Sequence, residues 1–369
     1  MPPLRCFPVT TPLGRWGLAI AAAMLLPLAG LPAPALSQAH AGDPLPSWRD
    51  GPARRAVLSW VQRVTQAGSP DFVPPAERIA TFDNDGTLWP ENPLPFQLRY
   101  ILDTLRARVE REPALARDPQ VQVALRGDPA SLMAPGSQLL ARVLELTATG
   151  MTVEEYAASV RQWLATARHP RYGRPYDQLT YQPMRELLCH LRAHGFRTWI
   201  VSGGGSDFIR VWSEAAYGIP PEQVVGSSTD TRFELRQGRP VLVKTLERRF
   251  LNDKAGKPVS IHAAIGRRPL AAFGNSDGDL EMLLFTTVAN PRPAFGMLVH
   301  HTDSRREYAY DTRPRSSGRL VEALAQAPSH GWVVVDMARD WSTLFPAVDA
   351  RLCSTSVTEE IAPIRAIQR

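Results

Sequence analysis

The chain has 369 residues, of which 44% are hydrophobic and 21% are charged, and this composition is that of a globular rather than a disordered protein. Its length suffices for one large domain or two domains of ordinary size. The formal net charge is +6, and arginine carries almost all of the positive charge. The sequence has no basic run with interleaved aromatic residues, which argues against nucleic-acid binding. A mild positive balance suits small anionic substrates.

Residues 1–41 are expected to be a signal peptide. Arg5 and Arg15 make a basic start, residues 16–31 are apolar, and small residues follow. Cleavage is expected after Ser37 or Ala41. The alternative is an uncleaved membrane anchor, but a spanning helix would have to contain Pro27, Pro32 and Pro34. We therefore expect a bacterial periplasmic or secreted protein with no stable membrane association after cleavage.

Two cysteines would remain after removal of the segment that contains Cys6. An oxidising compartment permits a disulfide between Cys189 and Cys353. Cys189 lies in an apolar helical pattern, however, and this position favours a buried free thiol. The sequence alone leaves both possibilities open.

The rest of the chain divides by its hydrophobic patterns into a core with a helical insertion. A helix from about residue 47 to residue 64 precedes the first buried strand, Ile79 to Phe82. The expected segments are a lead-in at 42–75, core at 76–92, a helical cap at 93–180, core again at 181–345, and a polar tail at 346–369.

The expected cap contains apolar residues at helical spacing over 96–109, 121–125 and 132–146. Thr152 and Glu155 have the spacing of a capping box and begin a helix that should run to about Ala167. The first strand signal after this helix falls at about residues 175–180. We expect a lid over whatever site lies at the end of the first strand.

In the second part of the core, strands alternate with helices, which predicts an α/β fold with a doubly wound parallel sheet. Further strands are expected at 197–201, 270–273, 288–290, 296–299 and 332–335. A hairpin or short strands are expected at 224–226, 232–235 and 240–243. Helices are expected at 183–194, 206–217, 257–265, 279–285 and 318–327.

Two carboxylates, Asp83 and Asp85, follow the first strand directly, before Gly86 and Thr87. Ligands of an open parallel sheet bind beyond the carboxyl ends of its strands. One of two acids at such a place can attack a substrate while the other transfers protons. The alternative is an ordinary Asp-Gly turn.

A second strand leads into Ser202, Gly203 and two further glycines. Bare backbone amides at a glycine-rich turn can hold an anion, and the Ser202 hydroxyl would add a donor. The alternative is a flexible turn without a ligand.

The three lysines of the chain are Lys244, Lys254 and Lys257. A phosphoryl group that gains charge in a transition state is stabilised by a fixed ammonium group. Lys257 begins a helix that faces the next core strand and is the preferred candidate, with Lys254 as the second choice. Lys244 falls in the expected hairpin, where we expect it to be solvated.

A fourth stretch places oxygen-bearing side chains after the strand at 270–273, from Asn275 through Asp277 to Asp279. Such hard oxygen ligands suit Mg²⁺, which keeps several waters and binds few carboxylates. The alternative is an Asn/Asp turn that caps the next helix.

This ordered set resembles the haloacid dehalogenase superfamily of phosphohydrolases. The resemblance covers about residues 79–335, and the helical insertion stands where that superfamily carries a C1 cap. Ser-Gly-Gly after the second strand is similar to the phosphoserine phosphatase branch. The Asp-Asn-Asp-Gly-Thr-Leu-Trp opening resembles secreted bacterial acid phosphatases, and phosphorylcholine phosphatases are a related possibility.

The resemblance implies a role for each matching residue. Asp83 would be the nucleophile that forms an aspartyl-phosphate, and Asp85 would protonate the leaving oxygen and then activate water. Lys257 would neutralise charge on the nucleophile and the phosphate. Ser202 and Gly203 would hold phosphoryl oxygens.

The resemblance also implies a Mg²⁺ site formed by Asp83, the backbone carbonyl of Asp85, Asn275 and Asp279. The usual residue at the position of Asn275 is Asp, and an amide oxygen adds no negative charge. Either Asn275 still binds the ion directly or Asp277 assists.

Other residues have weaker signals. Glu91 is a candidate substrate contact, and with Trp89 it could favour a cationic head group such as choline. A structural hinge into the cap is the simpler interpretation. His300 and His301 have no third ligand at a matching spacing, so a metal site there is not expected.

The expected function is that of an exported, Mg²⁺-dependent phosphomonoesterase that acts on a small phosphorylated metabolite. The second acid, Asp85, favours a phosphate ester over a halide, because an alkoxide leaving group needs a proton and a halide does not. The alternatives are a phosphotransferase on the same scaffold and a periplasmic phospho-ligand binding protein without catalysis.

Overall fold

The computed structural model describes residues 42–126, 131–132, 134, 137–312, 317–347 and 352–353. The expected signal peptide at 1–41 and most of the expected tail at 346–369 lie outside the described residues. In the part of the chain that the structure describes, none of the helices has the length and apolar character that a membrane span requires.

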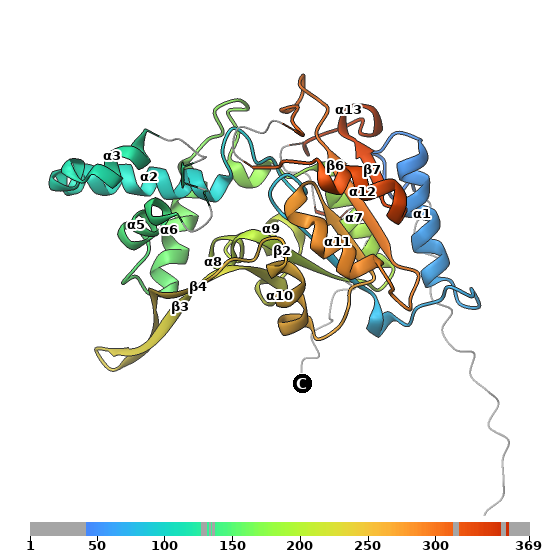
Figure 1. Cartoon of the computed structure of the whole chain (residues 1–369), viewed down its shortest axis with the longest axis horizontal. Helices are drawn as coiled ribbons and strands as arrows, with labels where there is room; N and C mark the ends of the chain where they lie inside the picture. The colour runs from blue at the N-terminus through green and yellow to red at the C-terminus, as the bar shows by residue number, and fades with distance from the viewer. Residues whose placement is uncertain are drawn as a thin grey trace, which may run out of the picture. The chain divides into compact units, whose positions relative to one another are not determined.

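A seven-stranded sheet forms the core, in the order β4-β3-β2-β1-β5-β6-β7 (Figure 1). The neighbouring strands are parallel except β3 and β4, which are antiparallel. The strands are β1 (Ile79–Phe82), β2 (Arg197–Gly205), β3 (Val224–Arg236), β4 (Arg239–Phe250), β5 (Ala271–Gly274), β6 (Phe295–His300) and β7 (Val333–Asp336). The predicted α/β class with a mostly parallel sheet is confirmed.

Helices surround this sheet in the described residues. They are α1 (Pro52–Thr65), α7 (Gln182–Ala193), α8 (Ser206–Ile209), α9 (Ser213–Tyr217), α10 (Gly256–Ile265), α11 (Leu280–Thr287), α12 (Glu322–His330) and α13 (Met337–Asp340). Short 3₁₀ turns are η1 (Pro75–Glu77), η4 (Pro221–Gln223) and η5 (Asp277–Asp279).

Both faces of the sheet are buried. Successive side chains of a strand point to opposite faces, and here they enter two different apolar clusters. Ile200 and Ala271 belong to the cluster that includes α1 and α7, whereas Val201 and Ala272 belong to the cluster that includes α10, α11 and α12. Continuous apolar runs in the central strands follow from burial on two sides.

The helical insertion lies between β1 and β2. It contains α2 (Phe96–Arg111), η2 (Pro113–Arg117), α3 (Pro119–Leu125), α5 (Gln138–Thr147), α6 (Val153–Thr166) and η3 (Tyr176–Gln178). Thr152 and Glu155 form the predicted capping box at the start of α6, with each side chain bonded to the other's backbone N–H.

Three expected elements differ from those observed. The strand signal at 175–180 is the turn η3, because Tyr176 packs edge-on against Phe96 instead of pairing with a strand. The single helix expected at 206–217 is broken into α8 and α9, where Trp212 stacks on Trp89 at 4.0 Å. The strand expected at 288–290 is a turn, held by Asn290, which donates to the carbonyl of Thr286.

The expected short strands at 224–243 are one long hairpin, β3 and β4, which continues past the other strands (Figure 1). Gln237 and Gly238 form its turn with positive φ of 53° and 77°. The pairing runs from Ser228 opposite Phe250 to Arg236 opposite Arg239. The part of the hairpin that continues past the other strands therefore has two faces that no further strand of the sheet flanks.

Cys189 of α7 and Cys353 form a disulfide across 164 residues of sequence. The free buried thiol favoured by the apolar pattern around Cys189 is thus wrong. The bond ties the chain near residue 353 to the helix that packs against the sheet.

Candidate active site

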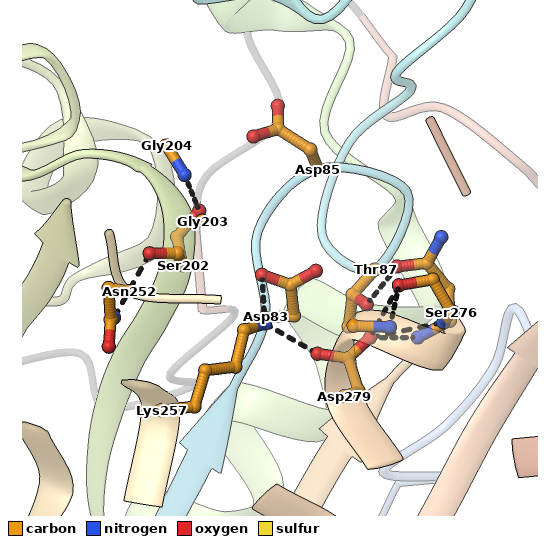
Figure 2. A network of polar contacts seen from close by, with 12 residues as sticks. Asp83, Asp85, Thr87, Ser202, Gly203, Gly204, Asn252, Lys257, Ser276 and Asp279 are labelled. Atoms are coloured by element: carbon orange, nitrogen blue, oxygen red, sulfur yellow. Dashed lines mark hydrogen bonds and ion pairs between the residues drawn. The ribbon is translucent and has the colours of Figure 1, made fainter. Parts of the chain in front are cut away.

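The site begins at the ends of three neighbouring strands. β1 lies between β2 and β5, and all three are parallel, so their carboxyl ends meet at one edge of the sheet. The backbone N–H of Asp83 donates to the carbonyl of Phe273 at 2.9 Å, and this fixes the acid beside the loop that follows β5. Figure 2 shows the residues that gather there.

Lys257 lies between two carboxylates. Its Nζ is 2.9 Å from Oδ1 of Asp83 and 2.5 Å from Oδ1 of Asp279 (Figure 2). Burial disfavours its charge, but the two carboxylates outweigh burial and raise the pKa of Lys257. Burial, followed by the charge of Asp279, raises the pKa of Asp83, and Lys257 opposes that rise. Two buried acids thus share one ammonium group.

Asp85 points from the same loop into the cavity. Its Oδ1 accepts a hydrogen bond of 2.7 Å from Nε1 of Trp89, whose ring is held by Trp212. Burial raises the pKa of Asp85 to about 6, although the Trp89 hydrogen bond favours the charged form. A carboxyl group with such a pKa can give and take a proton near neutral pH.

The Ser-Gly-Gly stretch is not the simple turn that the sequence predicts. β2 continues through Gly205 with a register shift after Val201. Ser202 is fully buried, and its Oγ accepts from the N–H of Gly204 at 3.0 Å (Figure 2). The N–H of Gly205 donates to Oε1 of Gln97 at 2.6 Å, so a residue of the cap reaches this loop directly.

Asn275 is buried with its amide in a defined orientation. Its Oδ1 accepts from Oγ1 of Thr87 at 2.9 Å, and its Nδ2 donates to Oε1 of Glu91 at 2.7 Å. Gly86 has a φ of 76°, and a Cβ there would come within 2.1 Å of Nδ2 of Asn275. The glycine of the first motif therefore makes room for the amide of the fourth.

Residues 80–284, more than half of the chain, match the haloacid dehalogenase-like hydrolases. The chain belongs to this family. A search among curated proteins found no match.

Several solved structures are similar to this haloacid dehalogenase-like hydrolase at low identity. A protein of unknown function from Bordetella pertussis Tohama I is 21% identical, with 71% of this chain and 99% of that chain covered and a TM-score of 0.44. A phosphoserine phosphohydrolase-like protein from Francisella tularensis subsp. tularensis SCHU S4 is 18% identical, with 68% and 98% covered and a TM-score of 0.35. A substrate-bound phosphoserine phosphatase is 13% identical, with 69% and 97% covered and a TM-score of 0.31.

In this haloacid dehalogenase-like hydrolase, the oxygens of Asp279 are occupied by protein donors. Oδ2 accepts from the N–H groups of Asn275 and Ser276, both at 3.0 Å, and Oδ1 faces Lys257. Asp279 therefore supports the loop and the lysine from behind. Asp277 also lines the cavity, and its Oδ1 accepts from the N–H groups of Val321 and Ala323 near the start of α12.

The remaining donor set fits a hard divalent cation. The Asp83 carboxylate, the Asp85 carbonyl and the Asn275 amide are oxygen donors of the kind that Mg²⁺ prefers. A cation beside Asp83 would also oppose the effect of burial and of Asp279, which raise the pKa of that carboxyl. In the described residues, no three His, Cys, Asp or Glu side chains are placed to hold a metal together. The donor set above is of a different kind, because two of its three oxygens belong to a backbone carbonyl and to an amide side chain.

Glu91 lies behind Asn275. It is 2% exposed, and besides the Asn275 amide it accepts from Tyr310 OH at 2.7 Å and from Ser317 Oγ. Burial raises the pKa of Glu91 to about 7, against the effect of the hydroxyl donors. Although Glu91 lines the cavity, these contacts orient the Asn275 amide, and the predicted contact with substrate stays a prediction.

A cavity of about 750 Å³ connects the carboxylates to the cap and the hairpin. Asp83, Asp85, Lys257 and Gly203 line it, together with residues of α2, α5, α6 and β4. Lys254 lies at this cavity and is exposed.

Lys244 is not solvated, contrary to the prediction from its place in the hairpin. It is 7% exposed, pairs with Asp207, and its Nζ lies 4.8 Å from the ring centre of Tyr156. The prediction was wrong because α5 and α6 pack against β4, and Asp207 of α8 pairs with the ammonium group.

No sequence signal predicted that His301 would support the loop that follows β1. Its Nε2 lies 2.7 Å from the carbonyl of Gly86, and its Nδ1 lies 3.0 Å from Oε2 of Glu307. Burial opposes protonation, but Glu307 outweighs it and raises the pKa of His301. The His301 ring thus contacts the backbone next to Asp85, although His301 belongs to none of the four sequence motifs.

Proposed function

We propose that this chain is a Mg²⁺-dependent phosphomonoesterase of the phosphoserine phosphatase-like branch that acts through an aspartyl-phosphate. One observation carries the proposal. Asp83 is paired with a buried lysine, and Asp85, with a pKa raised to about 6, lines the same cavity. A nucleophile, a proton carrier and a fixed positive charge are together what phosphoryl transfer needs.

In the first step, a carboxylate oxygen of Asp83 attacks the phosphorus and the ester P–O bond breaks. Asp85 gives its proton to the leaving alkoxide oxygen. In the second step, Asp85 takes a proton from a water that attacks the phosphorus, and the bond between Asp83 and phosphorus breaks. Lys257 balances charge on Asp83 throughout. Bound Mg²⁺ would supply further charge neutralisation at the phosphoryl oxygens.

The presence of Asp85 favours phosphate esters over halides as substrates. A halide leaves without a proton, whereas an alkoxide is a poor leaving group until it is protonated. The Trp89 hydrogen bond holds Asp85 in one position within the cavity wall, which suits repeated proton transfer.

Export to the periplasm or secretion is part of the proposal. The Cys189–Cys353 disulfide supports it, because disulfides persist in oxidising compartments and are rare in the bacterial cytosol. Mass spectrometry of the protein from its native host should find a mature N-terminus after Ser37 or Ala41. An intact N-terminus on the mature protein would contradict cleavage.

The decisive experiment measures phosphate release from a chromogenic phosphate ester with Mg²⁺ and with a chelator. We expect Asp83→Asn to abolish turnover and Asp85→Asn to slow it strongly and accumulate phosphate on Asp83, detected by mass spectrometry. Asp50→Asn is the matched control, since its side chain is 75% exposed and lies outside the cavity. Turnover by Asp83→Asn would exclude this mechanism.

Two alternatives have separate outcomes in the same assay. A phosphotransferase would convert an added alcohol into its phosphate ester at the expense of free phosphate. A protein that only binds phosphorylated ligands would retain a phosphate ester on a column and release no phosphate with Mg²⁺.

A further inference from the structure

The cavity extends well beyond the reacting carboxylates, and apolar side chains line its far part. Leu98 and Ile101 come from α2, and Leu140 and Leu144 come from α5. Its volume of about 750 Å³ lies within the range of roughly 300–1,000 Å³ that encloses a drug-sized ligand. The leaving group that fits this space is larger than serine or choline.

The charges on the cap side of the cavity are paired with each other. Lys244 and Asp207 form an ion pair, and the Lys244 ammonium occupies the face of Tyr156. A cationic head group would have to displace that ammonium to use the ring. The ring of Trp89 is stacked on Trp212 and is likewise engaged. The cap side of the wall therefore favours an uncharged leaving group over phosphorylcholine or an amino-acid phosphate.

Exposed apolar side chains gather where the cavity meets the hairpin. Of the eight large apolar residues that are exposed in the described part of the chain, five lie between residues 233 and 251: Phe233, Leu235, Leu242, Phe250 and Leu251. Clusters of this kind mark binding surfaces. Phe250 and Leu251 line the cavity itself.

Strand register extends this apolar surface away from the cavity. Phe233 pairs with Leu242, Leu235 pairs with Pro240, and Lys244 pairs with Thr231. Directly opposite residues share a face, and so do residues two apart along a strand. The apolar pairs thus lie on the same face of the hairpin as Lys244, which is one of the residues that line the cavity.

We propose that the substrate is a phosphomonoester of a long-chain amphiphile, whose apolar chain lies along the cap wall and leaves over the hairpin. This inference depends on the proposed phosphomonoesterase function. The phosphate would lie at Asp83, and the chain would contact the apolar residues of α2 and α5. Arg249 and Lys254, both exposed at the cavity, would attract the anionic head during approach.

A series of n-alkyl phosphates from ethyl to decyl, each below its critical micelle concentration, tests the inference. We expect kcat/KM to rise about fourfold for each methylene that enters the cavity, which corresponds to about 0.8 kcal/mol, and to level off at the longest chains. Phosphoserine and phosphorylcholine should be poor substrates. A flat series, or a preference for either of these two small esters, would overturn the inference while leaving the phosphatase function intact.

Two further outcomes separate the inference from related possibilities. If none of the esters releases phosphate, the proposed function itself fails. If the rate rises only above the critical micelle concentration, the chain is not bound singly in the cavity and the inference is wrong.

A variant pair tests the location of the chain. Leu144→Asn, at a half-buried cavity position, should lower the ratio of kcat/KM for decyl over ethyl phosphate at least tenfold. Val123→Asn is the matched control, because Val123 is 39% exposed on α3 and lies outside the cavity. As a readout independent of turnover, Asp83→Asn should bind decylphosphonate more tightly than ethylphosphonate by calorimetry. Equal binding of the two phosphonates would contradict the proposal.

Discussion

His169 is expected to make the folded protein sensitive to acid. The ring is 1% exposed, its Nε2 is 3.0 Å from the carbonyl of Asn92, and its Nδ1 accepts from the N–H of Arg171 at 3.2 Å. The neutral ring with hydrogen on Nε2 satisfies both contacts. Burial is the main reason why the pKa of His169 is lowered to about 4. A proton on Nδ1 would also face the N–H group of Arg171.

The sign of the effect follows from the two pKa values of His169. As the pH falls, the unfolded chain takes up its proton near 6.5 and the folded chain only near 4. Stability is thus fully present above the unfolded pKa and is lost between the two values. The full difference of about 2.5 pH units corresponds to about 3 kcal/mol, and at about pH 5 the loss is about 2 kcal/mol.

Urea unfolding of the wild type and of His169→Gln, compared at about pH 8 and about pH 5 with the disulfide intact, measures this loss. Glutamine keeps a donor and an acceptor but carries no charge at either pH. The wild type should lose about 2 kcal/mol more than the variant between the two conditions, because the other acid-sensitive groups contribute equally to both proteins. Parallel losses in the two proteins would refute the assignment to His169.

The remaining predictions concern the site and the disulfide. Lys257→Met leaves two buried carboxylates without their cation, so urea unfolding should show a loss of about 3–5 kcal/mol, and phosphate release should stop; unchanged stability would contradict the buried pairing. Asn275→Asp should weaken Mg²⁺ binding in calorimetry, because a carboxylate there faces Glu91 at hydrogen-bond distance, and adding Glu91→Gln should restore or exceed wild-type affinity. Tighter Mg²⁺ binding by Asn275→Asp alone would contradict this prediction, because it would show that Glu91 carries no negative charge. Cys353→Ser should lower the free energy of unfolding by about 2–4 kcal/mol, and reducing agent should have the same effect on the wild type only.

The sequence sufficed where a structural signal is local. Short apolar runs bounded by glycines or acids predicted β1, β2 and β5, and the order of strands and helices predicted their parallel arrangement. A capping box fixed the start of α6 to the residue. Because the strand ends meet at one edge, Asp83 and Lys257 lie together although 174 positions separate their numbers, and their catalytic roles remain predictions.

The sequence failed where a residue's environment comes from distant segments. Lys244 looks like a solvated hairpin lysine until α8 places Asp207 beside it. The interruption between α8 and α9 depends on the stacking of Trp212 with a residue 123 positions earlier. His301 touches Gly86 across 215 positions, with no spacing rule that could connect them. Such contacts follow from how elements pack, and packing is not encoded in any short window of sequence.

The departure at Asn275 shows how the two kinds of information combine. From the sequence it is a lost negative charge at the expected metal position. In the folded chain, the carboxylate of Glu91 stands 2.7 Å behind that amide, anchored by Tyr310 and Ser317. An acceptor at this distance requires that Asn275 turn its Nδ2 toward Glu91, which leaves its Oδ1 on the opposite side, toward Thr87. The acidic group near this position is thus Glu91, whose pKa burial raises to about 7, and not a side chain at position 275.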